Sequence, residues 1–372
     1  MKYLKKLPKF DQWFYIGIFI LLVKSILSHS TLLPISNLMD DLMSVLSCFF
    51  LGIPCIFKKY SHKSIIMCFI IVLCALLTCK KVDNLHLFIP IILIITSYKE
   101  DLNKLINFIF KTELVIFILH IILSIIFSFY GFEIIFVKAG GINTLTLGFS
   151  HPNILALFVL NLISMWAWLN YDFISKNDYI IIGIVTILTF VISKSRTTLI
   201  SIILLFGLIF IMKYLKQNKI LEYTKFLFPT CSIVTIISVI LYPYNIKIIN
   251  IINLLFSKRI QLGSKGLLNY GFTLFGQKIN YYPGFTFDNI YNVLFVNYGV
   301  IWIIICSILF YLLARKGNIK NNIFIIIWCF YGFTEIHGMN PFLYFPLLLV
   351  VELMNGNEVL DKIEFFKKYS IK

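Results

Sequence analysis

The stretch Tyr242–Tyr298 reads YPYNIKIINIINLLFSKRIQLGSKGLLNYGFTLFGQKINYYPGFTFDNIYNVLFVNY and decides the fold. It is a long segment that is neither a plausible membrane span nor a short connector, and apolar runs of bilayer length lie on both sides of it. Asp288 is its single anion, and its cations are Lys247, Lys258, Arg259, Lys265 and Lys278. The sequence therefore predicts a membrane-embedded chain whose long polar loop binds an anionic ligand.

The composition of the whole chain supports a membrane protein. Of its 372 residues, 59% are hydrophobic and 13% are charged, and the mean hydropathy is +0.90. A soluble core does not need so much apolar surface, so we expect an all-α polytopic fold with one membrane domain over residues 1–372. The basic start MKYLKKLPK precedes an apolar run without a small-residue cleavage site, which predicts an uncleaved first span.

The eight cysteines all lie within apolar runs, without a CxxC pair and without a histidine at ligand spacing. This pattern is typical of small hydrophobic core residues. We therefore expect no metal site, no disulfide framework and no cofactor.

Apolar runs long enough to cross a bilayer predict about twelve spans. One long external loop, residues 243–289, separates the ninth span from the tenth. The expected spans lie near 11–33, 38–57, 64–79, 84–98, 108–130, 150–169, 179–193, 197–212, 226–242, 290–313, 323–337 and 342–354.

Lysine and arginine are more frequent in the connections on the side of the N-terminus, so we expect both termini in the cytoplasm. The cations of the 243–289 loop are an exception to this distribution. An anionic ligand on the outer face explains them, and the alternative is that a long loop escapes the charge rule.

The segment Gly148–Asn153 reads GFSHPN and precedes the sixth span. Ser150 is a suitable N-cap, and Pro152 suits the first helical turn because its missing N–H needs no partner there. We expect His151 and Asn153 at a helix N-terminus on the outer surface, where free N–H groups attract anions. The alternative is that His151 only caps the helix.

The segment Ser193–Thr198 reads SKSRTT and forms a tight outward turn between the seventh and eighth spans. Sorting by charge disfavours Lys194 and Arg196 on this side of the membrane. The planar guanidinium of Arg196 is suited to hold a phosphate group through two parallel hydrogen bonds.

Within the long loop, Asn250–Leu255 is predicted to be an amphipathic helix that ends before Lys258 and Arg259. Repeated glycines and aromatic residues follow it. Aromatic faces pack against sugar rings, but they also form the belt at a membrane interface, so this composition leaves both interpretations open. Asp288 either caps the next helix or acts as a general base.

Other ionisable residues in the spans favour structural roles. We expect Lys24 to pair with the Asp40–Asp41 segment, and we expect Glu113 and His120 to share one inward helix face. Glu335 and His337 end the eleventh span and are expected to line the outer cavity, without sharing a metal ion.

A set of motifs shares the predicted outer side of the membrane. They are GFSHPN at 148–153, SKSRTT at 193–198, LFG at 274–276, DNIYNVLFVNYG at 288–299, and the late Glu335 and Asn340. Together they resemble the Wzy-type polysaccharide polymerases, integral-membrane enzymes related to the O-antigen ligases. The likeness covers roughly residues 148–340. The ligases begin the corresponding span with a His-Asn pair, whereas this chain has Asp288 and Asn289, which favours a polymerase.

The resemblance implies a metal-independent glycosyltransferase that joins lipid-linked oligosaccharide repeat units at the outer face of the bacterial cytoplasmic membrane. The glycan leaves undecaprenyl pyrophosphate and is transferred to a hydroxyl of the next unit. Arg196 and Arg259 would bind the pyrophosphate, and Asp288 would activate the acceptor. The expected substrate-binding residues are His151, Asn153, Lys194, Lys258, Asn289, Tyr291, Glu335, His337 and Asn340.

The implied partners are undecaprenyl-pyrophosphate-linked glycans, membrane lipid, and flippase and chain-length regulator proteins, with no nucleic acid. One alternative is a ligase that transfers finished polymer to an acceptor. A second alternative is a lipid-linked oligosaccharide flippase or transporter. That alternative is disfavoured because the ionisable groups collect at the outer ends of spans and no internal repeat is evident.

Overall fold

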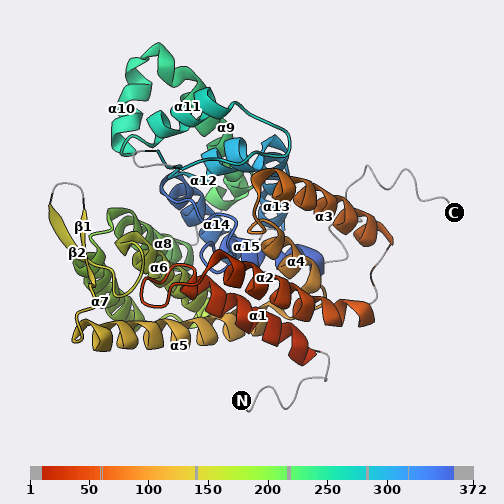
Figure 1. The fold of residues 1–372 in the computed structure, drawn as a ribbon, viewed down its shortest axis with the longest axis horizontal. Coiled ribbons are helices and arrows are strands. Elements are labelled where there is room, and N and C mark those ends of the chain that lie inside the picture. The colour runs from red at the N-terminus through yellow and green to blue at the C-terminus, as the bar shows by residue number, and fades with distance from the viewer. Residues whose placement is uncertain are drawn as a thin grey trace. The chain divides into compact units, whose positions relative to one another are not determined.

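The computed structural model describes residues 11–58, 60, 62–138, 141–215, 219–281, 285–316 and 318–355. The chain is predominantly helical and divides into two compact units (Figure 1). The first unit comprises Met1–Tyr60, Asn103–Lys216 and Asn340–Phe345, and the second comprises Ser61–Leu102, Gln217–Met339 and Pro346–Lys372.

Seven helices among the described residues are long and apolar enough to cross a membrane. They are Asn37–Phe57, Ile65–Val82, Leu102–Ser128, Pro152–Leu169, Lys176–Ser193, Arg196–Tyr214 and Leu221–Tyr244. Two shorter apolar helices cover Val300–Arg315 and Ile319–Thr334. The expectation of a helical chain with several helices long and apolar enough to span a membrane is therefore confirmed.

The first unit is built around a buried helix, α6, which contacts α7 and α8. Its helices are α1 (Asp11–Leu27), α2 (Asn37–Gly52), α5 (Leu102–Ser128), α6 (Pro152–Leu169), α7 (Lys176–Ser193) and α8 (Arg196–Leu215), with 3-10 turns at Ile53–Phe57 and Tyr171–Phe173. Most side chains of α6 are buried, whereas α7 leaves one face exposed, as expected for a helix that meets lipid.

One element of this unit was not expected from the sequence. An antiparallel hairpin of β1 (Ile135–Lys138) and β2 (Ile142–Leu145) lies beside α7 (Figure 1). The segment is too short and too polar to span a membrane, and its alternating β-branched residues favour strand pairing. The fold is thus mainly, rather than wholly, α-helical.

Two expectations about ionisable residues of the first unit are confirmed. Lys24 Nζ lies 3.0 Å from Asp40 Oδ2, as an ion pair. Glu113 and His120 are both buried on the inward face of α5. The Asn161 amide of α6 donates to Glu113 Oε1 at 3.4 Å. These polar contacts connect neighbouring helices inside the unit.

The second unit holds the long loop and the helices on either side of it. Its elements are α3 (His62–Val82), α4 (Phe88–Thr96), a 3-10 helix (Lys219–Phe226), α9 (Leu227–Leu241), a 3-10 turn (Tyr242–Tyr244), α10 (Lys247–Leu255), α11 (Arg259–Tyr270), α12 (Ile290–Asn292), a π-helix (Val293–Tyr298), α13 (Val300–Arg315), α14 (Ile319–Tyr331), a 3-10 turn (Gly332–Thr334), α15 (Pro346–Leu349) and α16 (Val351–Asn355). The predicted amphipathic helix at Asn250–Leu255 is confirmed as α10.

The expected span 290–313 is divided in the structure. It consists of α12, the π-helix and α13, with a break at Gly299, whose φ is +96°. The loop returns to this break, because Gln277 N donates to Asn297 O at 2.9 Å and Gly276 lies against Gly299. A Cβ atom on Gly299 would overlap Gly276. The close approach of the two backbones explains both glycines.

The expected span 342–354 is also not one helix. Its residues form turns followed by the short helices α15 and α16. Pro346 begins α15, and a proline disfavours helical geometry at the residue before it. Hydrophobicity alone did not reveal this interruption.

Candidate functional site

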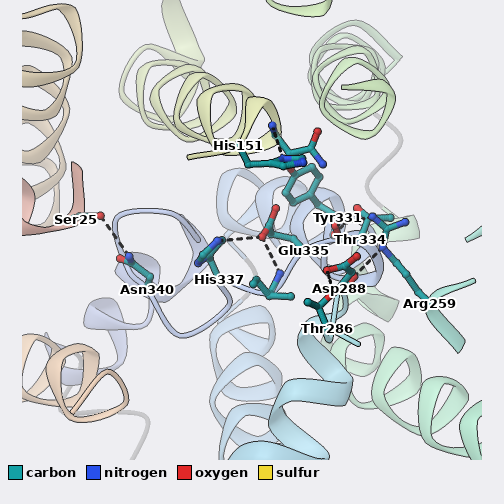
Figure 2. A network of polar contacts seen from close by, with 12 residues as sticks. Ser25, His151, Arg259, Thr286, Asp288, Tyr331, Thr334, Glu335, His337 and Asn340 are labelled. Atoms are coloured by element: carbon teal, nitrogen blue, oxygen red, sulfur yellow. Dashed lines mark hydrogen bonds and ion pairs between the residues drawn. The ribbon is translucent and has the colours of Figure 1, made fainter. Parts of the chain in front are cut away.

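Arg259 is fixed by main-chain carbonyls of three separate segments (Figure 2). Its Nε donates to Asp288 O at 2.9 Å, its Nη1 to Phe256 O at 3.3 Å and its Nη2 to Thr334 O at 3.5 Å. The guanidinium therefore connects three segments. They are Phe256 at the end of α10, Asp288 directly before the N-cap of α12, and Thr334 at the end of the 3-10 turn that follows α14. A side chain held in this way is oriented before any ligand binds.

The local sequence places Arg259 at this junction. Ser257 and Lys258 both adopt the left-handed conformation, with φ of 51° and 66°, and reverse the chain between α10 and α11. Asn253 stabilises the reversal, because its carbonyl accepts from Lys258 N at 2.7 Å and its side chain accepts from Gln261 N at 3.0 Å. Lys258 itself remains exposed.

The structure shows which of Asp288 and Asn289 caps α12. The Asn289 side chain caps α12 by accepting from Asn292 N at 3.1 Å. Asp288 is half-buried, and its carboxylate accepts a hydrogen bond from Thr286 Oγ1 at 3.2 Å (Figure 2). Asn289 rather than Asp288 is thus the helix cap, which leaves the Asp288 carboxylate for another role.

Glu335 is a buried carboxyl group directly after the 3-10 turn that follows α14 (Figure 2). Its Oε1 accepts from Ile336 N at 2.8 Å and lies 3.6 Å from His337 Nε2. Burial is the largest cause that raises the pKa of Glu335 from 4.5 to about 7. The Asp288 carboxylate also raises it, whereas hydrogen bonds from main-chain N–H groups and the charge of Arg259 lower it. Glu335 therefore changes its charge near neutral pH.

These residues form one polar cluster within the second unit, and we call Arg259, Asp288, Glu335 and His337 the Arg259 cluster. It combines a fixed guanidinium, a half-buried carboxylate and a carboxyl–imidazole pair. A guanidinium binds phosphate or carboxylate groups, and a carboxylate accepts a proton from a hydroxyl group. The cluster is therefore chemically able to bind an anion and to move a proton beside it.

Tyr291 lies in the core of the second unit. It is fully buried, and its hydroxyl donates to Cys329 O at 2.6 Å. Its ring packs against Phe228 and Phe333. Tyr291 therefore has a packing role in the core, and its expected role in substrate binding stays a prediction.

His151 and Asn153 lie at the start of α6 in the first unit. His151, not Ser150, is the N-cap, because its Nδ1 accepts from Asn153 N at 3.1 Å and Pro152 is the first helical residue. The prediction of a Ser150 cap was wrong, since the imidazole nitrogen reaches the same kind of N–H group. His151 also packs against Phe136 of β1.

Lys138 is a positioning residue that the sequence analysis missed. Its Nζ donates to Ser193 O at 2.8 Å, to Lys194 O at 3.4 Å and to Asn153 Oδ1 at 3.2 Å. It thereby holds the C-terminus of α7 and the start of α6 together, and a cation is favourable at the carbonyl groups that end α7. The sequence signal that could have identified Lys138 is a basic residue at the end of a segment rich in β-branched residues.

The turn that follows α7 exposes two cations. Lys194 ends α7 in the left-handed conformation, with φ of 51°, and Arg196 is the first residue of α8. The guanidinium of Arg196 is exposed and has no hydrogen-bond or ion-pair partner within the part of the chain that the structure describes.

Asn340 belongs to the first unit and has a structural role there. It donates to Ser25 Oγ at 3.3 Å and accepts from Phe342 N at 3.0 Å (Figure 2). The predicted site residues are thus distributed between the units. The second unit holds Lys258, Arg259, Asp288, Asn289, Tyr291, Glu335 and His337, and the first holds His151, Asn153, Lys194, Arg196 and Asn340.

Among the described residues, no group of three or more His, Cys, Asp or Glu side chains could hold a metal ion. The chain matches no known family model, no curated protein and no solved structure. Fold and site together define a helical protein with several candidate membrane spans and an arginine–carboxyl cluster where its long loop closes.

Proposed function

We propose that the protein is a polysaccharide polymerase of the Wzy type. It transfers a glycan from undecaprenyl pyrophosphate to a hydroxyl of a second lipid-linked repeat unit at the outer face of the bacterial cytoplasmic membrane. The observation that carries the proposal is the Arg259 cluster, in which an oriented guanidinium lies beside two carboxyl groups. About twelve spans, with both termini in the cytoplasm, belong to the same proposal.

In the proposed reaction, the bond between the anomeric carbon and the diphosphate oxygen breaks, and a new bond forms to the acceptor oxygen. Arg259 stabilises the charge that develops on the departing diphosphate. Asp288 accepts the proton of the acceptor hydroxyl. The guanidinium supplies the positive charge, so the reaction needs no metal ion.

Arg196 is proposed as a second phosphate contact, and Lys258 or His151 is proposed to assist the two arginines. The support for Arg196 is the exposed guanidinium at the start of α8, where it has no partner among the described residues. This assignment is independent of the Arg259 cluster and has its own variant in the test below. Flippase and chain-length regulator proteins are the proposed partners.

The test is polymer length on gels in a null strain complemented with Arg259→Ala, Asp288→Asn or Arg196→Ala. Loss of one phosphate-binding arginine should raise the barrier by about 3 kcal/mol, or ~100-fold in rate, and leave short oligomers. Lys265→Ala is the matched control, because Lys265 is an exposed cation of α11 outside the cluster.

Full-length polymer from all three variants at normal protein levels would contradict the site assignment. A second experiment separates polymerase from ligase. In a strain that lacks every other assembly enzyme, a polymerase accumulates polymer on the lipid carrier, whereas a ligase leaves single repeat units on the carrier.

A further inference from the structure

Helix α10 begins directly after a candidate membrane span. The span Leu221–Tyr244 ends two residues before α10, with only Asn245 and Ile246 between them. Two extended residues reach at most about 7 Å, so α10 lies close to the membrane surface on that side. Asn245 adopts the left-handed conformation, with φ of 54°, and turns the chain there.

One face of α10 is apolar and exposed. Ile248, Ile251 and Leu255 recur at helical spacing and are 64%, 50% and 77% exposed. The other face is buried, since Ile249 packs with Val239 and Ile260 in a core cluster of this unit. The exposed stripe is therefore not covered by the core that holds the helix in place.

Cations border this stripe. Lys247 begins α10 and Lys258 follows its end, and both are exposed. No acidic residue occurs between Tyr242 and Phe287, so this segment itself supplies no carboxylate to neutralise them. An apolar stripe bordered by lysines is complementary to a bilayer surface that carries anionic headgroups.

We propose that α10 lies in the lipid–water interface, with Ile248, Ile251 and Leu255 inserted between lipids and with Lys247 and Lys258 on anionic phospholipid headgroups. The two-residue connection to a span favours lipid over a protein partner, because it leaves the helix little distance from the bilayer.

A consequence for the site rests on the proposed function. Arg259 Nη1 donates to Phe256 O, directly after the last residue of α10. A helix anchored in the interface holds this guanidinium near the depth of the lipid phosphates. A lipid-linked diphosphate lies at the same depth.

The test uses the full-length protein in nanodiscs, with an environment-sensitive fluorescent amino acid at position 255. The matched control carries it at position 269, where Asn269 is an exposed polar residue of α11. Lipids with a quencher near the headgroup should quench position 255 several-fold more than position 269. Equal quenching at the two positions, or shielding of position 255 that requires a second protein copy, would overturn the proposal.

Lipid composition provides a second readout. Adding anionic lipid to zwitterionic nanodiscs should shift the emission of position 255 to the blue, and Lys247→Gln with Lys258→Gln should abolish the added shift. A shift that persists in the double variant excludes the assigned headgroup contacts. Neither measurement depends on polymer synthesis, so a failure of the proposed function leaves the result interpretable.

Discussion

Arg259 donates its Nε–H to the main-chain carbonyl of Asp288 at 2.9 Å rather than to the carboxylate of the same residue. The loop backbone thus orients the guanidinium, and the Asp288 carboxylate is held instead by Thr286. A positive and a negative group are placed side by side without pairing with each other. Such an arrangement leaves the cation for an anionic ligand and the carboxylate for a proton.

Replacing Arg259 by lysine should impair both stability and polymer formation. An ammonium group keeps the charge but cannot reach three carbonyls in the planar geometry of a guanidinium. We expect a loss of about 1–3 kcal/mol of stability, measured by thermal unfolding in detergent, together with shorter polymer. Lys258→Ala, at the exposed neighbouring residue, should leave the stability unchanged. Equal unfolding temperatures of Arg259→Lys and the wild type would contradict the bridging role.

Glu335 should make stability depend on pH. Burial raises its pKa from 4.5 to about 7 in the folded protein, so the folded state binds more protons between these values. The stabilisation of the folded protein by the protonated form of Glu335 is fully present below about pH 4.5 and is lost as the pH rises to about 7. It amounts to on the order of 3 kcal/mol.

Glu335→Gln removes the titrating group and should flatten this dependence when unfolding is followed from pH 5 to 8. Lys265→Gln serves as a control at an exposed residue of the same unit and should retain the slope. If Glu335→Gln also retains the wild-type slope, burial does not control this carboxyl group.

Tyr291→Phe tests the assignment of Tyr291 to the core. The substitution removes the hydrogen bond to Cys329 O and leaves that buried carbonyl without this donor. We expect a loss of about 1 kcal/mol of stability, with polymer length unchanged at equal protein levels. Shorter polymer in a variant of normal stability would instead restore the predicted substrate contact.

Lys138→Met tests the contact between the hairpin and the ends of two helices. It removes the ammonium group that binds Ser193 O, Lys194 O and Asn153 Oδ1, and it retains most of the side-chain volume. We expect a destabilisation of about 1–3 kcal/mol in thermal unfolding. The exposed Lys194→Met is the control and should change stability by less than half of that amount.

The hydrophobic pattern of the sequence predicted part of the fold. Long apolar runs predicted most of the long helices, and the amphipathic pattern predicted α10. The pattern did not predict the break at Gly299, where the loop backbone at Gly276 is in close contact with the chain between the π-helix and α13. It also missed the β1–β2 hairpin. The failure at Gly299 involves a contact with Gly276, which lies in another segment and which a local pattern does not contain. The hairpin pairs neighbouring segments, and it was missed because strand propensity depends strongly on context.

The candidate site was likewise predicted only in part from the sequence. The sequence identified Arg259, Asp288 and Glu335 because charged groups are rare and conspicuous in a chain that is 59% hydrophobic. It could not determine which of Asp288 and Asn289 caps α12, because both residue types are good caps. The hydrogen bond from Asn292 N to Asn289 decided that question.

By itself, the sequence determined that the chain is helical, with apolar runs long enough to span a membrane and with a cationic loop, because hydrophobic length and charge are properties of composition. Only the tertiary structure decided the partners of each polar group. Arg259 was oriented by three carbonyls, Glu335 acquired a raised pKa and Tyr291 became a core residue. The physical reason is that burial and hydrogen bonding depend on which segments meet in space.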